Sequence, residues 1–352
     1  MQLRGADLAH AAAAGRLALA LPRAAGPLTV DVAYRWRPHP FQGASAAGFT
    51  VVWPYFCGNL FPCHSAPADG TTFALALAGV PAGKTAVFPA AIATPAPAYQ
   101  LAWAIDDYVE RPLGTTAAGT RVAVWHQPEL AEAAARGTAH LAAAFDWLER
   151  TIGPYRFGRK VGTVSVRWAP GAMGGMEHHP YWHVGAAALG DVETHVHEAA
   201  HGWFGDGVRL RCWEDFVLSE GTASYLSARA LDAVAPDAGA EIWRRFEQQL
   251  GALAGTEPVW PRGCGAVDLL EDGLFTRAPY VRGALFYRAV AGKVGAAALD
   301  RALAAFYAAH AGGAATMAEM LQAIRDVTGY DAAACAERWL RSPARPAPGA
   351  CP

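Results

Sequence analysis

Two histidines four residues apart are the side chains in this sequence best suited to chemistry. The stretch from Thr194 to Asp206 reads THVHEAAHGWFGD, so Glu198 directly follows His197 and His201 lies one helical turn further on. On an α-helix, positions i and i+4 lie on one face, so both imidazoles can reach the same ion. The pattern predicts a zinc site held by His197 and His201, with Glu198 beside the ion but not bound to it.

A third ligand is expected from Glu220. A catalytic zinc ion takes three protein ligands and keeps a fourth position for water. Residues 202 to 219 separate His201 from Glu220, enough for one helix to end and a second to return antiparallel. Glu220 lies among apolar residues in FVLSEGTASYL, which favours a buried, metal-bound carboxylate over a solvated one. We therefore expect one zinc ion per chain, held by His197, His201 and Glu220.

Two kinds of element must position these side chains. From Leu28 to about His126 the chain has short β-rich runs between turn signals, including TTFALALAGV and AYQLAWAI, which are typical of an antiparallel sandwich or saddle. After Pro128 apolar residues recur at intervals of three and four, which predicts helices. Short strands are expected at VGTVSVRW and VGAAAL, and from Asp191 onward the sequence is almost wholly helical.

The sequence therefore predicts an α+β protein with three parts. Residues 1–127 form an N-terminal β domain, residues 128–341 form a mainly helical domain, and residues 342–352 are a proline-rich tail with no core to join. A chain of 352 residues, 53% of them hydrophobic, can bury two cores of ordinary size.

Composition limits the partners. A formal net charge of −2 provides no basic surface for nucleic acid, and the longest apolar runs are interrupted before they could cross a bilayer. We expect a small or peptide-like substrate, no nucleic acid and no membrane, with a monomer favoured. Asp7 and Arg16 interrupt the segment where a secretory signal would lie, which favours the cytoplasm, with the periplasm and secretion as alternatives. Cys57 and Cys63 are either two buried thiols or, in an oxidising compartment, a disulfide.

Several motifs in the same order resemble the M1 family of zinc metallo-aminopeptidases. HEAAH, the eighteen-residue gap and a glutamate followed by glycine resemble the family's gluzincin signature. GGMEH, from Gly174 to His178, is similar to the exopeptidase motif, and PYVRG, from Pro279 to Gly283, is similar to the segment with the catalytic tyrosine. WEDFVLSEGTASY and FPCHSAPADGTTF also resemble family segments. The resemblance covers roughly residues 28–300 and implies a β domain followed by a thermolysin-like catalytic domain.

The resemblance implies a role for each motif residue. Glu198 is the expected general base and acid, and Tyr280 the expected hydrogen-bond donor to the oxyanion. A carboxylate at Glu177 pairs with the α-ammonium of a peptide, so that only the first peptide bond reaches the metal. The expected substrate contacts are Gly174, Gly175, Met176 and Glu177.

This chain also departs from the family pattern. His178 stands where the family usually has Asn, and no Gln or Glu that could help bind the amine precedes FPCHSAP. The chain stops soon after AERWL, so we expect a compact form without the family's C-terminal helical domain and with a more open cleft. Glu193, Asp206 and Asp215 are candidates for hydrogen-bond partners of the zinc histidines.

Three functions fit these residues. The leading one is a zinc aminopeptidase that acts on peptides with a free N-terminus. The alternatives are a thermolysin-like endopeptidase and a non-catalytic, metal-stabilised peptide-binding module. The presence of every expected ligand together with Glu198 and Tyr280 weighs against the module.

Overall fold

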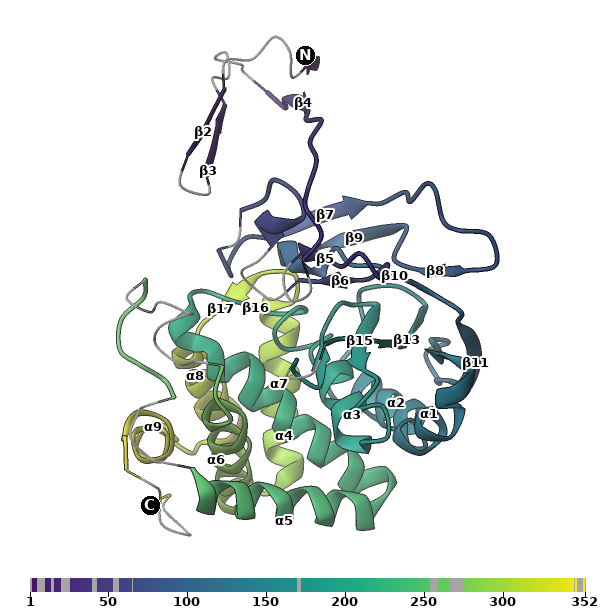
Figure 1. Ribbon diagram of the computed structural model, residues 1–352. Coiled ribbons are helices and arrows are strands. Elements are labelled where there is room, and N and C mark those ends of the chain that lie inside the picture. The colour runs from purple at the N-terminus through teal and green to yellow at the C-terminus, as the bar shows by residue number, and fades with distance from the viewer. Residues whose placement is uncertain are drawn as a thin grey trace.

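The chain combines a strand-rich N-terminal part with a helical C-terminal part. A computed structural model describes residues 2–4, 10–13, 16–19, 26–39, 43–52, 57–64, 66–169, 172–253, 259–265, 267, 275–344, 346 and 351. Antiparallel strand pairs dominate the first hundred residues, and helices follow one another after residue 191 (Figure 1). The predicted α+β class is confirmed.

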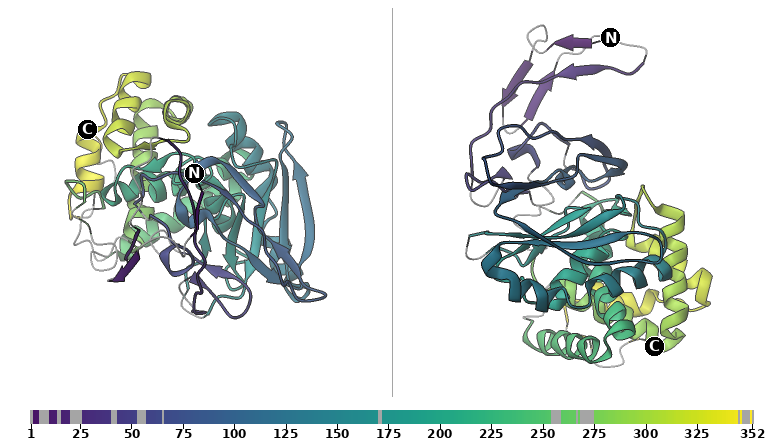
Figure 2. Two further views of the ribbon diagram at one scale, coloured as in Figure 1. Left: turned by 90° about the horizontal axis from the view of Figure 1, so that it is seen from above. Right: turned by 90° about the vertical axis from the view of Figure 1, so that its right-hand side faces the viewer.

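A five-stranded mixed sheet lies beside the helices. Its spatial order is β11 (Val109–Thr115), β12 (Arg121–His126), β13 (Lys160–Val166), β15 (Tyr181–Gly185) and β14 (Gly175–Met176). The three inner strands run parallel, and the two edge strands run antiparallel to their neighbours. Helices α1 (Ala131–Gly137), α2 (Leu141–Thr151) and α3 (Val192–Ala200) pack against it (Figure 2).

The sheet refines two expectations from the sequence. Strand β13 matches VGTVSVRW, and its central place explains why all but its first residue are buried. The strand expected at VGAAAL is only partly right, because β15 begins earlier, at Tyr181, and includes only Val184 and Gly185 of this stretch before the chain turns. Strand β12 ends at His126 and pairs with β13, so the sheet spans the domain boundary predicted at residue 127, which stays a prediction.

The strands before residue 109 form small two-stranded sheets. Their bounds are β1 Gln2–Arg4, β2 His10–Ala13, β3 Arg16–Leu19, β4 Thr29–Asp31, β5 Gly43–Ala44, β6 Thr50–Val51, β7 Thr71–Ala74, β8 Thr85–Val87, β9 Ala91–Ala96 and β10 Ala104–Asp106. The pairs are β1 with β4, β2 with β3, β5 with β6, β7 with β9, and β8 with β10. Strands β1 to β4 extend away from the rest of the molecule (Figures 1 and 2).

One predicted strand is partly wrong. In AYQLAWAI only the end forms a strand, β10, whereas Ala98–Gln100 form a 3-10 helix, η3, directly after Pro97. The fixed φ of proline suits the start of a helical turn. The turn buries Tyr99 and Gln100, which face the candidate site described below.

The helical part is built around α4 (Phe216–Val234). It packs against α5 (Pro236–Ala252) and α6 (Ala278–Val294), and α7 (Ala296–His310) packs against α8 (Met317–Thr328). The short helix α9 (Ala333–Ala336) and the strand pair β16 (Arg209–Leu210) and β17 (Ala314–Ala315) complete it. Helices α4 and α6 meet at Gly221 and Gly283, where a Cβ on Gly221 would lie 2.8 Å from Cα of Gly283.

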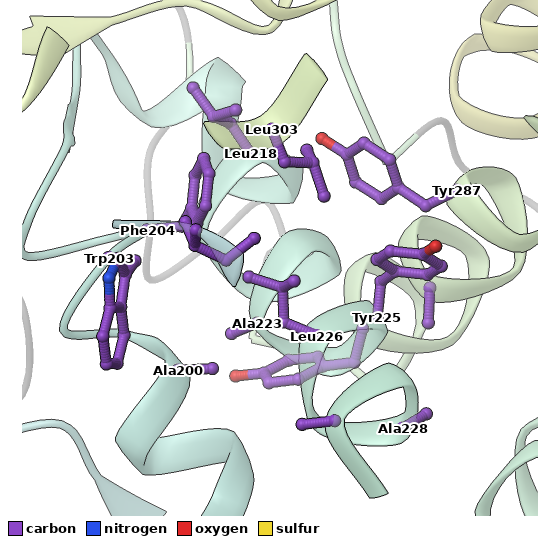
Figure 3. Close-up of a cluster of buried hydrophobic side chains, with 14 of the residues drawn as sticks. Ala200, Trp203, Phe204, Leu218, Ala223, Tyr225, Leu226, Ala228, Tyr287 and Leu303 are labelled. Carbon is purple, nitrogen blue, oxygen red and sulfur yellow. The ribbon is translucent and has the colours of Figure 1, made fainter. Parts of the chain in front are cut away.

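One large apolar core joins these helices to the sheet. Figure 3 shows part of it, where Phe204, Leu218 and Leu303 belong to a single cluster with exposures of 1% or less. Because α4 is buried on nearly all sides, apolar and small residues lie on all its faces rather than along one stripe. A helix enclosed in this way gives Glu220 a fixed position.

All six cysteines form disulfides. The pairs are Cys57–Cys63, Cys212–Cys264 and Cys335–Cys351. Cys57 and Cys63 therefore form the disulfide that the sequence allowed, rather than two buried thiols. The third contradicts the expectation that the tail has no core to join, because Cys351 is buried and bonded to α9. Among the described residues, no helix has the length and apolar character needed to span a membrane.

Candidate active site

The site lies where α3, α4, α6 and the edge strand β14 meet. Helix α3 carries His197 and Glu198 and has His201 at its C-cap, α4 carries Glu220 in its second turn, and α6 carries Tyr280 in its first. Asp191 caps α3 by accepting from the Thr194 backbone N–H at 3.0 Å. These elements line one cleft of about 80 Å3, whose walls also include residues 173–177.

The three predicted zinc ligands come together. His197 Nε2 lies 3.1 Å from Oε2 of Glu220, His201 Nε2 lies 3.3 Å from the same oxygen, and the two Nε2 atoms are 3.1 Å apart. A tetrahedral ion with bonds of about 2.0–2.1 Å requires ligand atoms about 3.3–3.4 Å apart. The donor set and its spacing therefore fit a zinc ion with one position left for water.

The charges around these ligands also fit a cation. Burial lowers the pKa of His201, but Glu220, Glu177 and Glu198 outweigh this effect and raise it well above its ordinary value. Burial alone would raise the pKa of Glu220, but the imidazoles of His201 and His197 lower it to about 2. Without a metal, the imidazole of His201 therefore holds a proton more firmly than a free imidazole does. A divalent cation provides that positive charge directly.

The outer nitrogens of both histidines have partners other than the predicted ones. His201 Nδ1–H donates to the Phe204 carbonyl at 3.0 Å, and His197 Nδ1 lies 3.3 Å from Ser224 Oγ. Such contacts fix the ring orientation and leave Nε2 free for the ion. The three carboxylates expected from the sequence bond to other residues. Glu193 accepts from Arg245, and Asp206 accepts from Tyr99. Asp215 accepts from Trp260 and from the Met317 N–H.

Glu198 lies against a residue that has no side chain. A Cβ on Gly175 would overlap the carboxylate of Glu198, so only glycine fits there. Behind Glu198, His179 Nε2–H donates to its backbone carbonyl at 2.9 Å, and His179 Nδ1 accepts from Tyr155 at 2.7 Å. Burial lowers the pKa of His179 to about 3, so its ring stays neutral and can make both bonds.

Glu177 projects into the same cleft and has a buried partner. The Tyr99 hydroxyl lies 2.7 Å from Oε1 of Glu177 and 3.1 Å from Oδ1 of Asp206, and Gln100 Nε2 donates to the Glu177 carbonyl at 2.9 Å. One ligand atom each from Glu177, Glu198 and His201 lies within 4.8 Å of the others. The carboxylate of Glu177 therefore lies close to both Glu198 and His201.

Tyr280 completes the cleft on the α6 side. Its ring lies 5.7 Å from that of His197, and the side chain is buried. Burial, with a further contribution from the charge of Glu220, raises the pKa of Tyr280 well above its ordinary value. The phenol therefore keeps its proton over the whole working range of pH and can donate a hydrogen bond.

The sequence predicted the three side chains that come together, His197, His201 and Glu220, but not the residues that form hydrogen bonds around the site. Tyr99, Gln100, Ser224 and Tyr155 carry no motif of their own, since the fold alone brings them to the site. The sequence predicts that His178 and His179 either face solvent or form hydrogen bonds. His179 does not face solvent, but it forms two hydrogen bonds. His178 is 2% exposed and its ring packs on His183 at 4.9 Å.

The residues of this site lie in a part of the chain that resembles a known protein family. Residues 188–339 match the Peptidase family M1 domain. This part of the chain is therefore similar to the M1 peptidase domain. The match spans the predicted ligands and Tyr280, and the resemblance drawn from the motifs is confirmed.

Aminopeptidases are among its relatives. Aminopeptidase B of Rattus norvegicus is 33% identical over 191 residues, which cover 48% of this chain and 28% of that protein. Aminopeptidase N of Streptomyces lividans is 28% identical over 156 residues, which cover 42% of this chain and 18% of that protein. Leucine aminopeptidase 2 of Ajellomyces capsulatus is 27% identical over 281 residues, which cover 71% of this chain and 42% of that protein. This chain thus spans less than half the length of these relatives.

Solved M1 structures share its fold. An M1 zinc metallopeptidase from Deinococcus radiodurans, bound to a Tyr-Ser-Ala substrate, matches with a TM-score of 0.76 at 20% identity, covering 97% of this chain and 83% of that one. A two domain M1 zinc metallopeptidase bound to L-tryptophan gives the same values. The likeness extends over both the strand-rich and the helical parts.

Proposed function

We propose that this M1 chain is a zinc aminopeptidase that removes the first residue of peptides with a free N-terminus. The observation that carries the proposal is the distance between two features of one cleft. The carboxylate of Glu177 lies within 4.8 Å of His201, so an amine bound there leaves room for a single residue before the metal position.

We further propose that His197, His201 and Glu220 hold one zinc ion per chain. When bound, such an ion lowers the pKa of its water ligand to about 7 and polarises a carbonyl group. The support is the near-tetrahedral spacing of the three donor atoms and the excess of carboxylates around them.

Each remaining residue has one task. Glu198 accepts a proton from the attacking water and passes it to the leaving amine, and such proton transfer contributes about 10² to 10⁴ in rate. Tyr280 donates its phenolic hydrogen to the carbonyl oxygen as negative charge develops there. Glu177 binds the α-ammonium, and Tyr99 holds the Glu177 carboxylate in place. Gly175 has no side chain, so the carboxylate of Glu198 can lie directly against the edge strand β14.

Paired substrates test the proposal. We expect the purified chain with one equivalent of zinc to cleave a free peptide and to leave its N-acetylated form intact. Equal cleavage of both would favour the thermolysin-like endopeptidase. Cleavage of neither, with zinc bound, would favour the binding module.

A substitution tests the proton transfer. Glu198→Gln keeps the size of the side chain but cannot accept a proton, so we expect zinc content to be unchanged and kcat to fall by at least about 10²-fold. Glu132→Gln, on the exposed side of α1, controls for the loss of one charge. A Glu198→Gln variant that binds zinc and retains full activity would refute the assigned role.

A further inference from the structure

His179 is a buried histidine to which the proposed mechanism gives no task. It lies in the turn between β14 and β15, two residues after Glu177, and its side chain is fully buried. Other rings surround it, with centroids 5.1 Å away for Trp182, 5.6 Å for Tyr155 and 5.7 Å for Phe157. A ring packed in this way holds one orientation, so each of its nitrogens has a fixed partner.

The two partners of the ring determine where its hydrogen lies. The Glu198 carbonyl, 2.9 Å from Nε2 of His179, can only accept, so Nε2 carries the hydrogen. In the neutral ring Nδ1 then accepts, and the Tyr155 hydroxyl donates to it at 2.7 Å. Tyr155 thereby fixes the tautomer that His179 needs in order to donate to Glu198.

The Glu198 carbonyl needs this donor because it lies at the end of a helix. The last carbonyls of an α-helix have no N–H partner within the helix, and α3 ends at Ala200. The Gly202 N–H, four residues after Glu198, bonds to the Ala199 carbonyl at 3.2 Å. A Cβ on Gly202 would lie 2.9 Å from Cε1 of His179, so only glycine leaves room for the ring there.

The backbone of His179 is also bonded to Glu177. The His179 N–H donates to the Glu177 carbonyl at 2.7 Å, while the side chain donates to the Glu198 carbonyl. One carboxylate oxygen of Glu177 and one of Glu198 lie within 4.8 Å of each other. A single residue therefore links the backbones of the proposed amine ligand and the proposed proton acceptor.

We propose that His179 is a positioning residue that holds Glu198 at the distance from Glu177 that cleavage of the first peptide bond requires. The inference rests on the proposed aminopeptidase function and adds a residue to it. Both glutamates line the cleft but His179 does not, so it acts through the backbone of Glu198. A misplacement of about 1 Å at a reacting group can cost about 10²-fold in rate, so kcat should depend on this hydrogen bond.

Two substitutions separate positioning from packing. His179→Leu fills a comparable space but removes both side-chain hydrogen bonds, whereas His179→Gln keeps an N–H donor and an oxygen acceptor. The backbone N–H that bonds to Glu177 remains in both variants. We therefore expect kcat of zinc-loaded His179→Leu to fall by about 10- to 10²-fold, with KM and zinc content unchanged, and His179→Gln to recover most of this loss.

Two further variants serve as checks. His126 is 4% exposed, bonds to the Gln127 carbonyl at 2.8 Å and does not line the cleft, so His126→Leu is a matched control that should keep the wild-type kcat. Tyr155→Phe should lower kcat in the wild-type background. It should have no further effect in His179→Leu, because Tyr155 acts through the ring of His179.

Hydrogen exchange of the metal-free protein provides a readout that needs no turnover. The N–H groups of Gly202, Trp203 and Phe204 bond to carbonyls at the end of α3. In His179→Leu these amides should exchange about two- to tenfold faster, the factor that corresponds to one net hydrogen bond. In His179→Gln and His126→Leu they should exchange as in the wild type.

The outcomes separate the inference from the function beneath it. A zinc-loaded wild type that cleaves no free peptide would overturn the proposed function, and unchanged exchange in His179→Leu would then overturn the inference as well. With an active wild type, an unchanged kcat in His179→Leu would overturn the inference alone. Loss of zinc together with kcat, or a His179→Gln variant as impaired as His179→Leu, would show that His179 only packs the core.

Discussion

Glu177 depends on a neighbour that no motif reveals. Tyr99 comes from η3 in the strand-rich part, and its hydroxyl lies between Glu177 and Asp206. Burial raises the pKa of Asp206 well above its ordinary value, with a further contribution from the charge of Glu177, so Asp206 holds a proton more firmly than a free carboxyl group. The Tyr99 hydroxyl donates to Oε1 of Glu177 at 2.7 Å and so holds this carboxyl group in place.

Removing the hydroxyl of Tyr99 should weaken amine binding. A hydrogen bond to a charged group contributes about 1.5–3 kcal/mol, and about 1.4 kcal/mol corresponds to a tenfold change. We expect Tyr99→Phe to raise KM for free peptides by about tenfold or more, with zinc content unchanged. Tyr108→Phe, which loses a bond to the Ser165 carbonyl, is the matched control. An unaltered KM in Tyr99→Phe would show that Glu177 needs no such support.

The residues of the site divide by how the sequence encodes them. His197, Glu198 and His201 follow from helical spacing, and Glu220 from its apolar surroundings, so they could be predicted and the structure brings them together. Ser224 and Tyr155 could not, because their positions depend on how separate elements pack. The carboxylate partners expected for the histidines were wrong since a hydroxyl and a backbone carbonyl lie closer.

At the scale of elements, the crossing of α4 and α6 fixes the site. Glu220 directly precedes Gly221, and Tyr280 lies one turn before Gly283, where the two backbones touch. Small residues allow this close approach. Any side chain at the crossing would push Glu220 and Tyr280 apart.

A methyl group at the crossing should damage both stability and activity. In Gly283→Ala the new Cβ overlaps Cα of Gly221, and overpacking of this kind costs about 1–3 kcal/mol. We expect a lower urea midpoint and a reduced kcat. Gly292→Ala, in the same helix with open space around it, should instead raise stability by about 0.4–1 kcal/mol and leave kcat unchanged. Equal stabilities of the two variants would contradict the close contact.

Helices were easier to predict than strands. The apolar repeat after Pro128 and from Asp191 onward corresponds to α1 through α8, because each of these helices is long enough to show its period. The strands of the first hundred residues are short, and several are only two or three residues long. Over such lengths, alternation cannot distinguish a strand from the turn that buries Tyr99.

At the scale of the whole molecule, buried histidines link stability to pH. Burial lowers the pKa of His183 to about 3, and a hydrogen bond with the Thr50 backbone offsets this only partly. An unfolded histidine has a pKa of about 6.5, so below that pH the unfolded chain binds a proton that the folded chain does not. Stability is therefore lost as pH falls from about 6.5, and His178, in ring contact with His183, adds to the loss.

Replacing His183 should reduce this acid sensitivity. We expect the free energy of unfolding of His183→Gln to fall less steeply than that of wild type between pH 6 and 4, by about 1.4 kcal/mol per pH unit. Urea unfolding of both proteins at several pH values provides the measurement, and the difference between them cancels any release of metal. Parallel pH profiles would show that His183 is protonated in the folded chain.

The three disulfides indicate the kind of compartment in which this protein folds. Three disulfides are typical of proteins from oxidising compartments. The predicted cytoplasmic location stays a prediction, and this feature favours its alternatives, the periplasm and secretion.

Arg209 joins the two parts of the molecule in an unusual way. Its guanidinium donates to the carbonyls of Ala68, Pro95 and Gly312, so it bonds only to backbone oxygens there. Every amino acid supplies such an oxygen. The side chains at these three positions can therefore change during evolution without loss of the hydrogen bonds that join the two parts.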